Sequence, residues 1–504
     1  MSAPTSYRAP VAVPLAEVAT AVGGTLSRSG GGAARGLRQD SRAILPGEVF
    51  VARAGERADG LDYVDQAVAR GACAVLAERG HAPKSATVPL LLVDDVRLAM
   101  AQAAAVIYGE PTRALPTVGV TGTNGKTTTC SLVQSVLESQ GQLPAVMGTL
   151  GAGIGNRRID TGLNTPEADE LTRIAAWLRD QGASHLLMEV TSHALAQRRT
   201  DGLCFRVAAF TNLTRDHLDL HGTMQAYGDA KERLFVDLEP DVAAVMVDDP
   251  FGASLADRAR ASVLRVSARP GSRADLRPSS PPELSPSGIR CAVATPAGSV
   301  DLHSPLLGAH NLENLLLALA VLIALDVDGP AAAAGLAASR AVPGRLERCD
   351  EAADDLTVFV DYAHSPDALE RVLTTVRLLT KSQVICVFGC GGNRDRDKRP
   401  LMGEVVARLA DVAIVTNDNP RDEAPEIIAQ GIVAGTEGAP APPLVELDRG
   451  RAIAIAIARA KPGDVVVIAG KGHETTQTVG SESVPFDDRE RARQALTRRR
   501  LGQP

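Results

Sequence analysis

The segment TVGVTGTNGKTTTC (117–130) combines glycine, lysine and threonine at a spacing suited to holding phosphate groups. An apolar run leads into the loop, and the helix-compatible sequence SLVQSVLESQG follows it. Backbone N–H groups of such a loop can surround phosphates, Lys126 can reach the terminal ones, and the Thr127 hydroxyl can ligate Mg²⁺. The usual first glycine is replaced by Val120, with Gly119 one residue earlier. The predicted phosphate-binding residues are Gly122, Thr123, Asn124, Gly125, Lys126, Thr127 and Thr128.

Two further clusters place carboxylate and imidazole groups after apolar runs. Glu189 ends the run HLLMEV, and DHLDLHG brings His217, Asp219 and His221 after another run. Such donors at neighbouring strand ends could hold Mg²⁺ beside the terminal phosphate of a nucleotide. Each residue alone would more commonly cap a helix or lie in a solvated loop. Their repetition after successive strands favours one shared site.

The loops that carry this chemistry follow a repeated pattern of short apolar runs and helical segments. From residue 117 the runs are TVGVTGTNG, LLMEVTSH, RVAAFTNLTRDH and DVAAVMVDD. A second series contains LTVFVDYAHSPD, VICVFGCGGNRDRD, VAIVTNDNPRD and DVVVIAGKGHE. This is the βαβ pattern of parallel sheets, which bind ligands at the carboxyl ends of their strands.

The pattern predicts an α/β protein of three domains. Residues 1–112 alternate helical patterns with runs such as GEVFVA, and we expect a small α/β domain there. Residues 113–341 should form a P-loop domain with a parallel sheet, and residues 342–504 a Rossmann-like domain. The Pro- and Ser-rich segment 268–288 is expected to run over the surface. The sequence AVPGRLE (341–347) is expected to form a hinge.

The composition is typical of a soluble globular protein, with a hydrophobic fraction of 45% and a formal net charge of -7. This charge offers no basic field for nucleic acid. The N-terminus has no basic region followed by an apolar core, and the longest apolar run, 315–325, is too short to cross a membrane and predicts a buried helix. The seven cysteines lack metal-binding spacing and fit reduced, packed thiols. We therefore expect a cytoplasmic protein with no nucleic-acid partner and no membrane insertion, and we expect a monomer.

One ordered series of motifs resembles a known enzyme family. GTNGKTT, EVTSH, DHLDLHG with AKERLF, GAHNLEN, GRLE, DYAHSPDAL, GCGGNRDRDKRPLM, DNPR and GKGHE follow one another along the chain. The series resembles that of the Mur ligases, ATP-dependent amide-forming enzymes of peptidoglycan precursor synthesis. The resemblance implies a UDP-binding N-terminal domain, a central ATPase domain and a C-terminal amino-acid domain, with ATP and Mg²⁺ as cofactors. The implied reaction phosphorylates a carboxylate, and an amine then attacks the acyl phosphate.

The resemblance also implies roles for single residues. Thr127 and Glu189 would ligate one Mg²⁺, and His217 would help with a second. Lys231 in AKERLF matches a lysine that this family carbamylates, which would supply a carboxylate-like ligand; an exposed helical lysine is the alternative. The implied catalytic residues are Lys126, Glu189, His217 and Lys231. The implied nucleotide contacts beyond the phosphate loop are Asn311, Asn314, Arg345 and Asp361.

A third group of residues matches family positions around the substrate UDP-MurNAc-L-Ala-D-Glu. The implied contacts are Gln39, Ser41, Glu56, Arg57, Ala58, Asn164, Thr165, Thr191, Gln197 and Arg199. Taken alone, DSR followed by PG could be a simple turn. Many relatives have two threonines where this chain has LNTPE, which leaves the contact of Asn164 open. His364 in DYAHSPDAL could approach the nucleotide or cap a helix.

The loop DNPR bears on which amino acid is added. Family members that use meso-diaminopimelate carry DNPR, whereas lysine users replace its arginine, since lysine has no far carboxylate to pair with it. The implied diaminopimelate contacts are Arg394, Asp418, Asn419, Pro420, Arg421, Gly470 and Glu474. Asn393 stands where many relatives have Asp. Because an amide carries no charge, Arg394 has a weaker counter-ion beside it in the sequence.

Three alternatives remain at this point. The same ligation could use L-lysine, and an assay with both amino acids separates the two. A folylpolyglutamate-type amide ligase would share much of the central region, but DNPR and the DSR segment argue against it. A P-loop kinase or a nucleotide-gated binding protein would leave the C-terminal clusters without a purpose.

Overall fold

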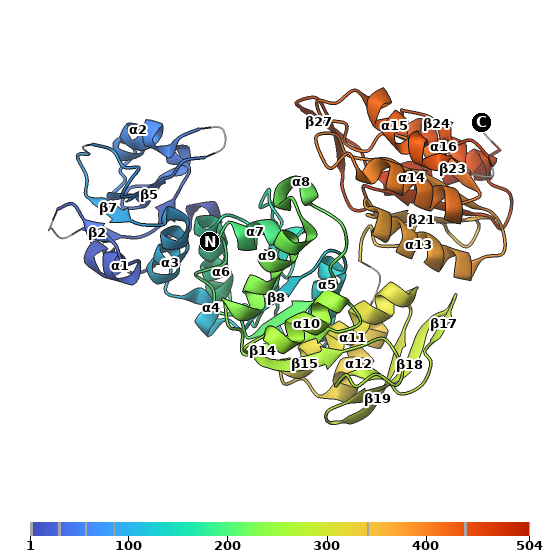
Figure 1. Cartoon of the computed structure of the whole chain (residues 1–504), viewed down its shortest axis with the longest axis horizontal. Helices are drawn as coiled ribbons and strands as arrows, with labels where there is room; N and C mark the ends of the chain where they lie inside the picture. The colour runs from blue at the N-terminus through green and yellow to red at the C-terminus, as the bar shows by residue number, and fades with distance from the viewer. Residues whose placement is uncertain are drawn as a thin grey trace.

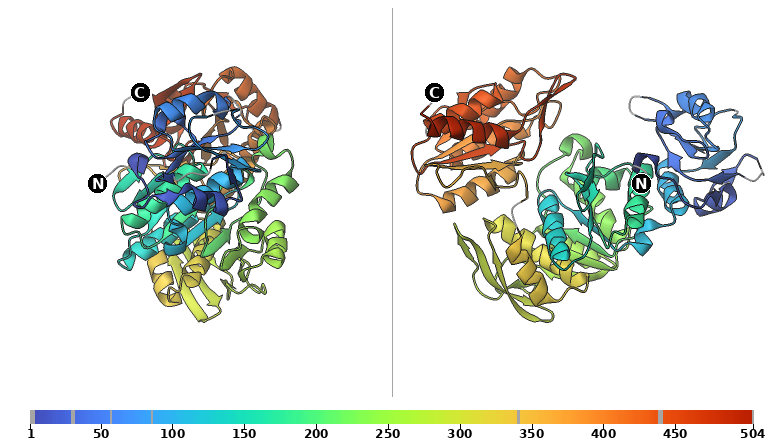
Figure 2. Two further views of the ribbon diagram at one scale, coloured as in Figure 1. Left: turned by 90° about the vertical axis from the view of Figure 1, so that its left-hand side faces the viewer. Right: turned by 180° about the vertical axis from the view of Figure 1, so that it is seen from behind.

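The computed structural model describes residues 4–28, 32–55, 58–84, 86–339, 342–437 and 441–502. Three α/β bodies follow the chain order, with the N-terminal and C-terminal bodies at opposite ends of the molecule (Figures 1 and 2). Each is built on its own sheet, and the three main sheets are largely parallel. The predicted α/β fold class is confirmed.

The N-terminal sheet has the strand order β2-β7-β6-β5-β4, with β2 as an antiparallel edge. Its strands are β2 (Thr25–Leu26), β4 (Leu37–Arg38), β5 (Val49–Ala52), β6 (Ala74–Glu78) and β7 (Leu90–Val93), and a separate pair is formed by β1 (Val13–Pro14) and β3 (Ala33–Ala34). The helices are α1 (Leu15–Ala21), α2 (Val64–Ala69), α3 (Val96–Ile107) and α4 (Pro111–Ala114). The Asp95 side chain caps α3, accepting bonds from the N–H groups of Arg97 and Leu98. The alanine-rich α3 then packs against α6 (Ala168–Asp180) of the central body.

The central sheet has eight strands in the order β11-β10-β9-β12-β8-β13-β14-β15. They are β8 (Thr117–Thr121), β9 (Ala145–Gly148), β10 (Gly151–Ile154), β11 (Arg157–Ile159), β12 (Leu186–Glu189), β13 (Val207–Phe210), β14 (Val242–Met246) and β15 (Ser262–Val266). Along β13, Ala208 and Phe210 enter one hydrophobic core, whereas Val207 and Ala209 enter a second core on the other face. Because both faces are covered, these strands read as continuous apolar runs.

Helices cover both faces of the central sheet. They are α5 (Lys126–Ser139), α6 (Ala168–Asp180), α7 (Ser192–Ala196), α8 (Leu218–His221), α9 (Met224–Val236), α10 (Pro250–Arg258), α11 (Ala309–Ala324) and α12 (Gly329–Ala338). The predicted buried helix is α11, whose residues 315–322 are fully buried. Within the described ranges, no helix combines the length and apolar character needed to span a membrane.

A small antiparallel sheet lies beside α12 and includes part of the Pro- and Ser-rich segment. Its strands are β16 (Arg277–Pro278), β17 (Glu283–Ser285), β18 (Gly288–Thr295) and β19 (Gly298–Ser304). The segment 268–288 does run largely over the surface, with most of its residues exposed or half-buried. It also supplies the short strands β16 and β17 and buries Ala274 and Leu276. These strands form because the long strand β18 offers an edge with which even Pro-rich sequence can pair.

The C-terminal sheet has the order β20-β21-β25-β22-β23-β24. Its strands are β20 (Glu347–Arg348), β21 (Thr357–Asp361), β22 (Val384–Phe388), β23 (Val412–Val415), β24 (Leu444–Val445) and β25 (Val465–Ala469), and β26 (Thr476–Val479) and β27 (Glu482–Pro485) form a hairpin. The helices are α13 (Pro366–Leu379), α14 (Lys398–Leu409), α15 (Pro425–Val433), α16 (Arg449–Arg459) and α17 (Asp488–Arg500). The polar loops that the sequence singles out follow β21, β22, β23 and β25, the parallel strands.

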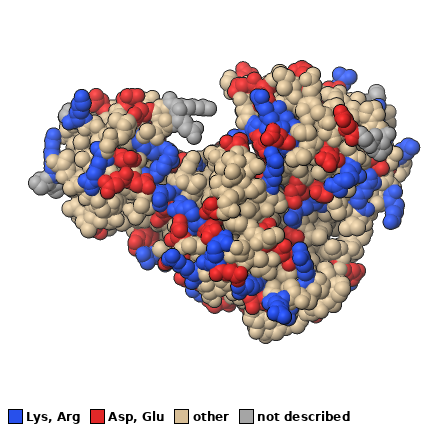
Figure 3. Space-filling model, viewed as in Figure 1, with Lys and Arg blue, Asp and Glu red and all other residues tan. Residues whose placement is uncertain are grey.

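The three bodies are joined in two different ways. One hydrophobic core runs continuously from the N-terminal sheet into the central sheet, through α3 and α6. The described contacts of the C-terminal body with the central body include polar bonds, such as Asn124 to Asp367 at 2.9 Å and Arg371 to Glu313 at 2.7 Å. On the face shown in Figure 3, basic and acidic side chains are intermixed and the surface is hollowed between the two end bodies.

Candidate active site

The phosphate loop joins β8 to α5, and glycine is required at two of its positions. Gly122 has φ of 141°, and a Cβ there would lie 1.8 Å from Thr211 Oγ1. Gly125 has φ of 90°, and its Cβ would lie 2.3 Å from Asn314 Oδ1. The absence of a side chain at these two glycines therefore lets the loop backbone pack closely against Thr211 and Asn314. Val120, which departs from the usual motif, lies inside β8 with its side chain in a hydrophobic core.

Lys126 begins α5 and folds its ammonium back over the loop. Its Nζ donates to the carbonyl oxygens of Gly122 at 2.9 Å and Thr123 at 2.8 Å. Burial lowers the pKa of Lys126. The side chain is thus held where phosphate oxygens would meet the loop, and a charge in so dry a place interacts strongly with an anion.

Glu189 at the end of β12 faces the phosphate loop and accepts three hydrogen bonds. Thr127 Oγ1 donates to Glu189 Oε1 at 2.9 Å, and the N–H and Oγ1 of Thr149 donate to its two oxygens, also at 2.9 Å. A hydroxyl and a carboxylate oxygen are hard donors that suit Mg²⁺, so Thr127 and Glu189 fit the metal role predicted for them. No group of three or more His, Cys, Asp and Glu side chains suited to a metal occurs within the described residues.

Lys231 is buried, which rules out the alternative of an exposed helical lysine. It lies on α9, donates from Nζ to the Gly122 carbonyl at 2.9 Å and stands 4.4 Å from the ring centre of Tyr227. Burial, and then the charge of Lys126, hold its pKa well below the usual range. No carboxylate pairs with it among the described residues, so its neutral amine is favoured. A neutral amine is the form that can react with CO₂.

His217 caps the short helix α8 in a left-handed conformation, with φ of 55°. Its ring meets that of His193 edge-on at 5.2 Å, and Nε2 lies 3.5 Å from Asp216. Desolvation lowers the pKa of His217, which keeps the imidazole neutral near pH 7 and able to act as a ligand. Asp216 also lies 3.9 Å from Nε2 of His364, which comes from the C-terminal body.

One cavity of about 420 Å³ brings most of these groups together. The predicted residues that line it are Gly122, Thr123, Asn124, Gly125, Lys126, Thr127, Asn164, Thr165, Glu189, Thr191, Arg199, His217, Lys231, Arg345, His364 and Arg394. Arg345, His364 and Arg394 come from the C-terminal body, so two bodies share the site. A second, smaller cavity on the other side of the phosphate loop is lined by Asn124, Gly125, Thr128, Asn311, Asn314, Arg345 and Asp361 among others.

Arg345 connects the two cavities. Its guanidinium stacks over the Tyr362 ring at 4.6 Å and donates to Thr127 Oγ1 at 3.3 Å. Asp361 accepts bonds from the N–H groups of Leu346 and Ala363, which fixes the chain beside Arg345. Asn314 Nδ2 donates to Asn311 Oδ1 at 3.2 Å, and Asn311 Nδ2 donates to the Leu307 carbonyl.

The residues predicted to meet the UDP-linked substrate divide into two groups. Thr165 and Thr191 bond each other at 3.2 Å, and Arg199 Nη1 donates to the Thr165 carbonyl at 2.9 Å. Arg199 is also paired with Glu167 at 2.8 Å and accompanied by Gln197 at 2.6 Å. Exposed Asn164 lies beside them at the cavity.

Among the predicted UDP contacts that the structure describes, Gln39, Ser41 and Ala58 do not line this cavity. Gln39 bonds Asp169 of α6 and Arg53, and Ser41 Oγ bonds Gln66 at 2.6 Å. Ala58 is exposed, and its carbonyl accepts a hydrogen bond from the Gly55 N–H. Glu56 and Arg57 lie outside the described residues.

The amino-acid loops of the C-terminal body form their own cluster. Asn419 Nδ2 donates to Glu474 at 3.0 Å, and the fully buried Lys471 donates to Glu474 at 2.8 Å and to Asn419 at 3.1 Å. A Cβ on Gly470 would lie 2.5 Å from the Asp418 carboxylate, so glycine leaves room for that group. Two carboxylates, those of Asp418 and Glu474, therefore face one small region.

Arg421 is held by its backbone and its side chain. Its φ is 53°, its N–H donates to the Thr478 carbonyl, and Nη1 donates to the Gly392 carbonyl at 2.8 Å. A Cβ placed on Gly391 would lie 3.0 Å from Arg421 Nη1 and 3.8 Å from Arg394 Cγ. The two predicted arginines therefore lie close together. A Cβ placed on Gly392 would lie 1.8 Å from the Pro420 carbonyl oxygen, so glycine leaves room for that carbonyl.

The sequence reasoning missed several polar residues of the site. Thr149, His193 and Tyr227 line the cavity, and Lys471 supports the amino-acid loops. Tyr227 could have been found from its i, i+4 spacing to Lys231 on one helix. Lys471 stands inside the quoted motif GKGHE. Thr149 follows the apolar run PAVMG, the same signal used for Glu189.

Comparison with known proteins identifies the family. Three family models match: "Mur ligase family, catalytic domain" at residues 34–108, "Mur ligase middle domain" at 120–322 and "Mur ligase, glutamate ligase domain" at 344–472. UDP-N-acetylmuramoyl-L-alanyl-D-glutamate–2,6-diaminopimelate ligase of Gloeobacter violaceus is 44% identical over 92% of this chain and 94% of its own. The protein of the same name from Streptomyces coelicolor is 42% identical over 96% of each chain.

Solved structures agree with this assignment. A structure of a ligase of that same name is 34% identical, has a TM-score of 0.66 and covers 92% of this chain and 95% of its own. MurF ligase from Thermotoga maritima, solved in complex with ADP, has a TM-score of 0.62 at 20% identity over 92% of this chain and 98% of its own, a likeness of fold alone. From its sequence, its fold and these relatives, this chain belongs to the Mur ligase family.

Proposed function

We propose that this protein joins meso-2,6-diaminopimelate to the D-Glu carboxylate of UDP-MurNAc-L-Ala-D-Glu, using ATP and an acyl-phosphate intermediate. One observation carries the proposal. The phosphate loop, Glu189 and Lys231 face a single cavity to which the C-terminal body adds Arg345 and Arg394. A nucleotide, an acidic acceptor and an incoming amine can thus be gathered at one place.

The residues of the cavity suit phosphorylation of a carboxylate. The γ-phosphate of ATP and the acceptor are both anionic, so their approach needs fixed positive charge. Lys126 at the loop and Arg345 from the C-terminal body supply it. Arg199, held by Glu167 and Thr165, is placed to pair with a carboxylate or diphosphate of the UDP-linked substrate.

Mg²⁺ would be held by Thr127 and Glu189, with His217 and a carbamate on Lys231 at a second position. When bound, it would neutralise phosphate charge that the protein leaves uncompensated. The Thr149 bonds hold the Glu189 carboxylate in place for this role.

The second half of the reaction needs a free amine beside the acyl phosphate. We propose that Arg421 and Arg394 pair with a carboxylate of diaminopimelate and that Asp418 and Glu474 take its distal ammonium. L-Lysine would leave Arg421 without its anion, which is the basis for selectivity.

We further propose that residues 1–112, 113–341 and 342–504 act as the three functional domains, and that the protein works as a cytoplasmic monomer. The N-terminal domain would bind the UDP moiety through Gln39, Ser41, Glu56, Arg57 and Ala58.

Phosphate release from ATP and UDP-MurNAc-L-Ala-D-Glu tests the function directly. We expect release that depends on meso-diaminopimelate, and far slower release with L-lysine at the same concentration. Equal rates with the two amino acids would contradict the selectivity. Release that needs no amino acid would contradict ligation itself.

A further inference from the structure

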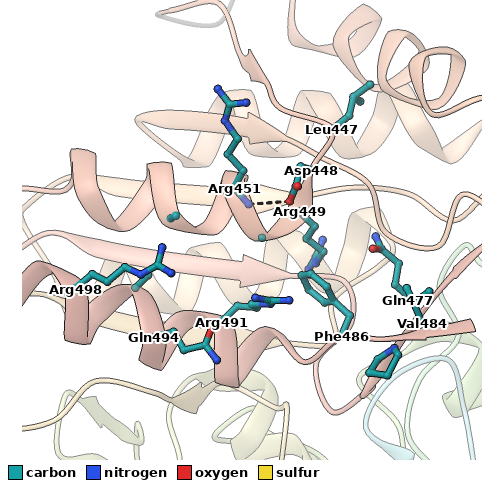
Figure 4. A pocket seen from close by; sticks show the side chains of 14 residues that line it. Leu447, Asp448, Arg449, Arg451, Gln477, Val484, Phe486, Arg491, Gln494 and Arg498 are labelled. Carbon is teal, nitrogen blue, oxygen red and sulfur yellow. Dashed lines mark hydrogen bonds between the residues drawn. The ribbon is translucent and has the colours of Figure 1, made fainter. Parts of the chain in front are cut away.

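A second groove, of about 630 Å³, lies on the C-terminal body and shares no lining residue with the cavity at the phosphate loop. It runs along α16 and α17, and the hairpin residues of β27 close one end (Figure 4). Phe486 and Gln477 lie near Val484 at this end, Arg491 of α17 lies near the middle, and Arg498 of α17 lies toward the opposite end. The proposed ligation uses none of these residues.

The ion pairs of α17 single out the two arginines that line the groove. The helix carries six arginines. Four of them have carboxylate partners in the segment 347–355: Arg489 and Arg493 with Glu347, Arg499 with Asp355, and Arg500 with Glu351 and Asp354. Arg491 and Arg498 have no ion-pair partner within the described ranges. Acidic residues of 347–355 pair with the other four arginines of the helix instead. The charges of these two exposed arginines are therefore not neutralised by carboxylates of the described residues.

An aromatic ring holds one of these guanidinium groups, that of Arg491, in place. Arg491 lies over the Phe486 ring at 5.3 Å, which restricts its conformations before any ligand arrives. Gln477 and Gln494 add neutral hydrogen-bonding groups. Arg451 at the rim is already paired with Glu446 at 3.1 Å, and Asp448 caps α16 beside it. The unpaired positive charges of the groove are therefore those of Arg491 and Arg498, on the side formed by α17.

The spacing of the two arginines indicates what size of anion fits. They are seven residues apart on one helix, which places their Cα atoms roughly 10 Å apart along its axis. A single small ion cannot bridge them, whereas an organic molecule with an anionic group at each end can. The volume is also in the range of small-molecule sites, about 300–1,000 Å³. Arginine binds phosphate in the same forked geometry as carboxylate.

Two other lining residues connect the groove to the amino-acid loops. Gln477 Nε2 donates to the Asp418 carbonyl at 2.7 Å. The buried Arg449 donates to the carbonyls of Asn417 at 3.2 Å and Ala469 at 2.9 Å while paired with Asp488. A ligand that moves either side chain would shift the loop that bears Asp418 and Asn419.

We propose that this groove binds a small organic bisphosphate through Arg491 and Arg498, and that its occupancy changes the affinity for the amino acid through Gln477 and Arg449. The binding is independent of the proposed ligation, whereas the coupling rests on it. Coupling of this kind is reciprocal, so the amino acid must change bisphosphate affinity by the same factor.

Calorimetric titration of the full chain with fructose 1,6-bisphosphate tests the binding, with ADP present at saturation to fill the nucleotide cavity. We expect one site that weakens roughly tenfold or more in the double variant Arg491→Ala/Arg498→Ala. The matched control Arg493→Ala/Arg500→Ala, on the same helix, should bind as the wild type does. Inorganic phosphate should bind at least about tenfold more weakly, because it meets one arginine at a time.

Absence of binding to the wild type, or an equal loss in both double variants, would overturn the site. Equal affinity for inorganic phosphate would overturn the two-anion ligand. Thermal unfolding checks that the variants fold, and Arg491→Gln/Arg498→Gln replaces the alanine pair if they do not.

The coupling is tested by KM for meso-diaminopimelate with and without the bisphosphate. We expect a change of about threefold or more, within the usual range of coupling energies, with KM for ATP unchanged. The change should vanish in Arg491→Ala/Arg498→Ala. An unchanged KM would overturn the coupling while the calorimetric site stands. If no ligation is observed at all, the proposed function fails. The titration still decides whether the groove binds the bisphosphate.

Discussion

Lys231 Nζ and Lys126 Nζ donate to the same oxygen, the carbonyl of Gly122, each at 2.9 Å. Two ammonium groups would repel one another so close together in a buried place, and this repulsion contributes to the lowered pKa of Lys231. Conversion of Lys231 to a carbamate would turn that repulsion into attraction.

Replacement of Lys231 by alanine should therefore lower kcat by roughly 100-fold or more, the size typical for loss of one fixed charge-stabilising group. Short carboxylic acids such as acetate should restore part of the activity by standing in for the carbamate. Lys381→Ala, which removes an exposed lysine, is the matched control. Unrescued loss, together with an unmodified intact mass of gently prepared protein, would count against the carbamate.

Arg421→Ala should raise KM for diaminopimelate by roughly 10- to 150-fold, since a charge-assisted bond is worth about 1.5–3 kcal/mol. KM for ATP should stay within about twofold, because Arg421 lines neither cavity at the phosphate loop. Steady-state kinetics with each substrate varied in turn measures both. Arg408→Ala, an exposed arginine paired with Glu370, should change neither constant. A parallel rise in both constants for Arg421→Ala would mean that the loop is structural.

Thr149→Val should weaken Mg²⁺ binding roughly 10- to 100-fold, as other losses of support for a metal ligand do. The change removes the hydroxyl that holds one oxygen of Glu189 and retains the backbone bond to the other. Titration of activity with Mg²⁺ measures the shift. Thr149→Ser keeps the hydroxyl and should behave nearly as the wild type. Identical metal dependence in the valine and serine variants would remove Thr149 from the metal's support.

His310 should make the fold sensitive to mild acid. Burial, then the charges of Arg371 and Arg345, lower its pKa from 6.5 to about 4. Between these values the unfolded chain binds the proton and the folded chain does not, so stability is lost as pH falls from 6.5 toward 4. The loss from this residue is at most about 3 kcal/mol. Urea unfolding of wild type and His310→Gln at pH 7 and pH 5 should show a smaller drop in the variant. The exposed His303, changed to Gln, should leave the drop unchanged.

The sequence allowed prediction of those features that repeat along the chain or depend on local chemistry. The runs that end at Thr121, Glu189 and Phe210 alternate with helices, and so the parallel sheet and its functional edge could be inferred. The burial of Lys231 could not, because it arises from Tyr227 and the loop at Gly122, one near in sequence and one far. The strands inside 268–288 were missed because their pairing depends on β18, not on their own composition.

Proximity across bodies was also beyond local reasoning. Nothing in the sequence around Arg345 indicates that its guanidinium reaches Thr127 of the central body. Ser41, bonded to Gln66 in its own body, stays a predicted UDP contact.

The hydrophobic core shared by the N-terminal and central sheets has a consequence for how the chain melts. Because side chains from both bodies pack into one cluster, neither can lose its packing without exposing part of the other. The two should form a single cooperative unit. The C-terminal body has its own clusters on the two faces of its sheet, and its bonds to the centre include Asn124 to Asp367. It should therefore unfold as a separate unit. The proposed meeting place of the amine and the acyl group thus lies between two parts of the chain that melt independently.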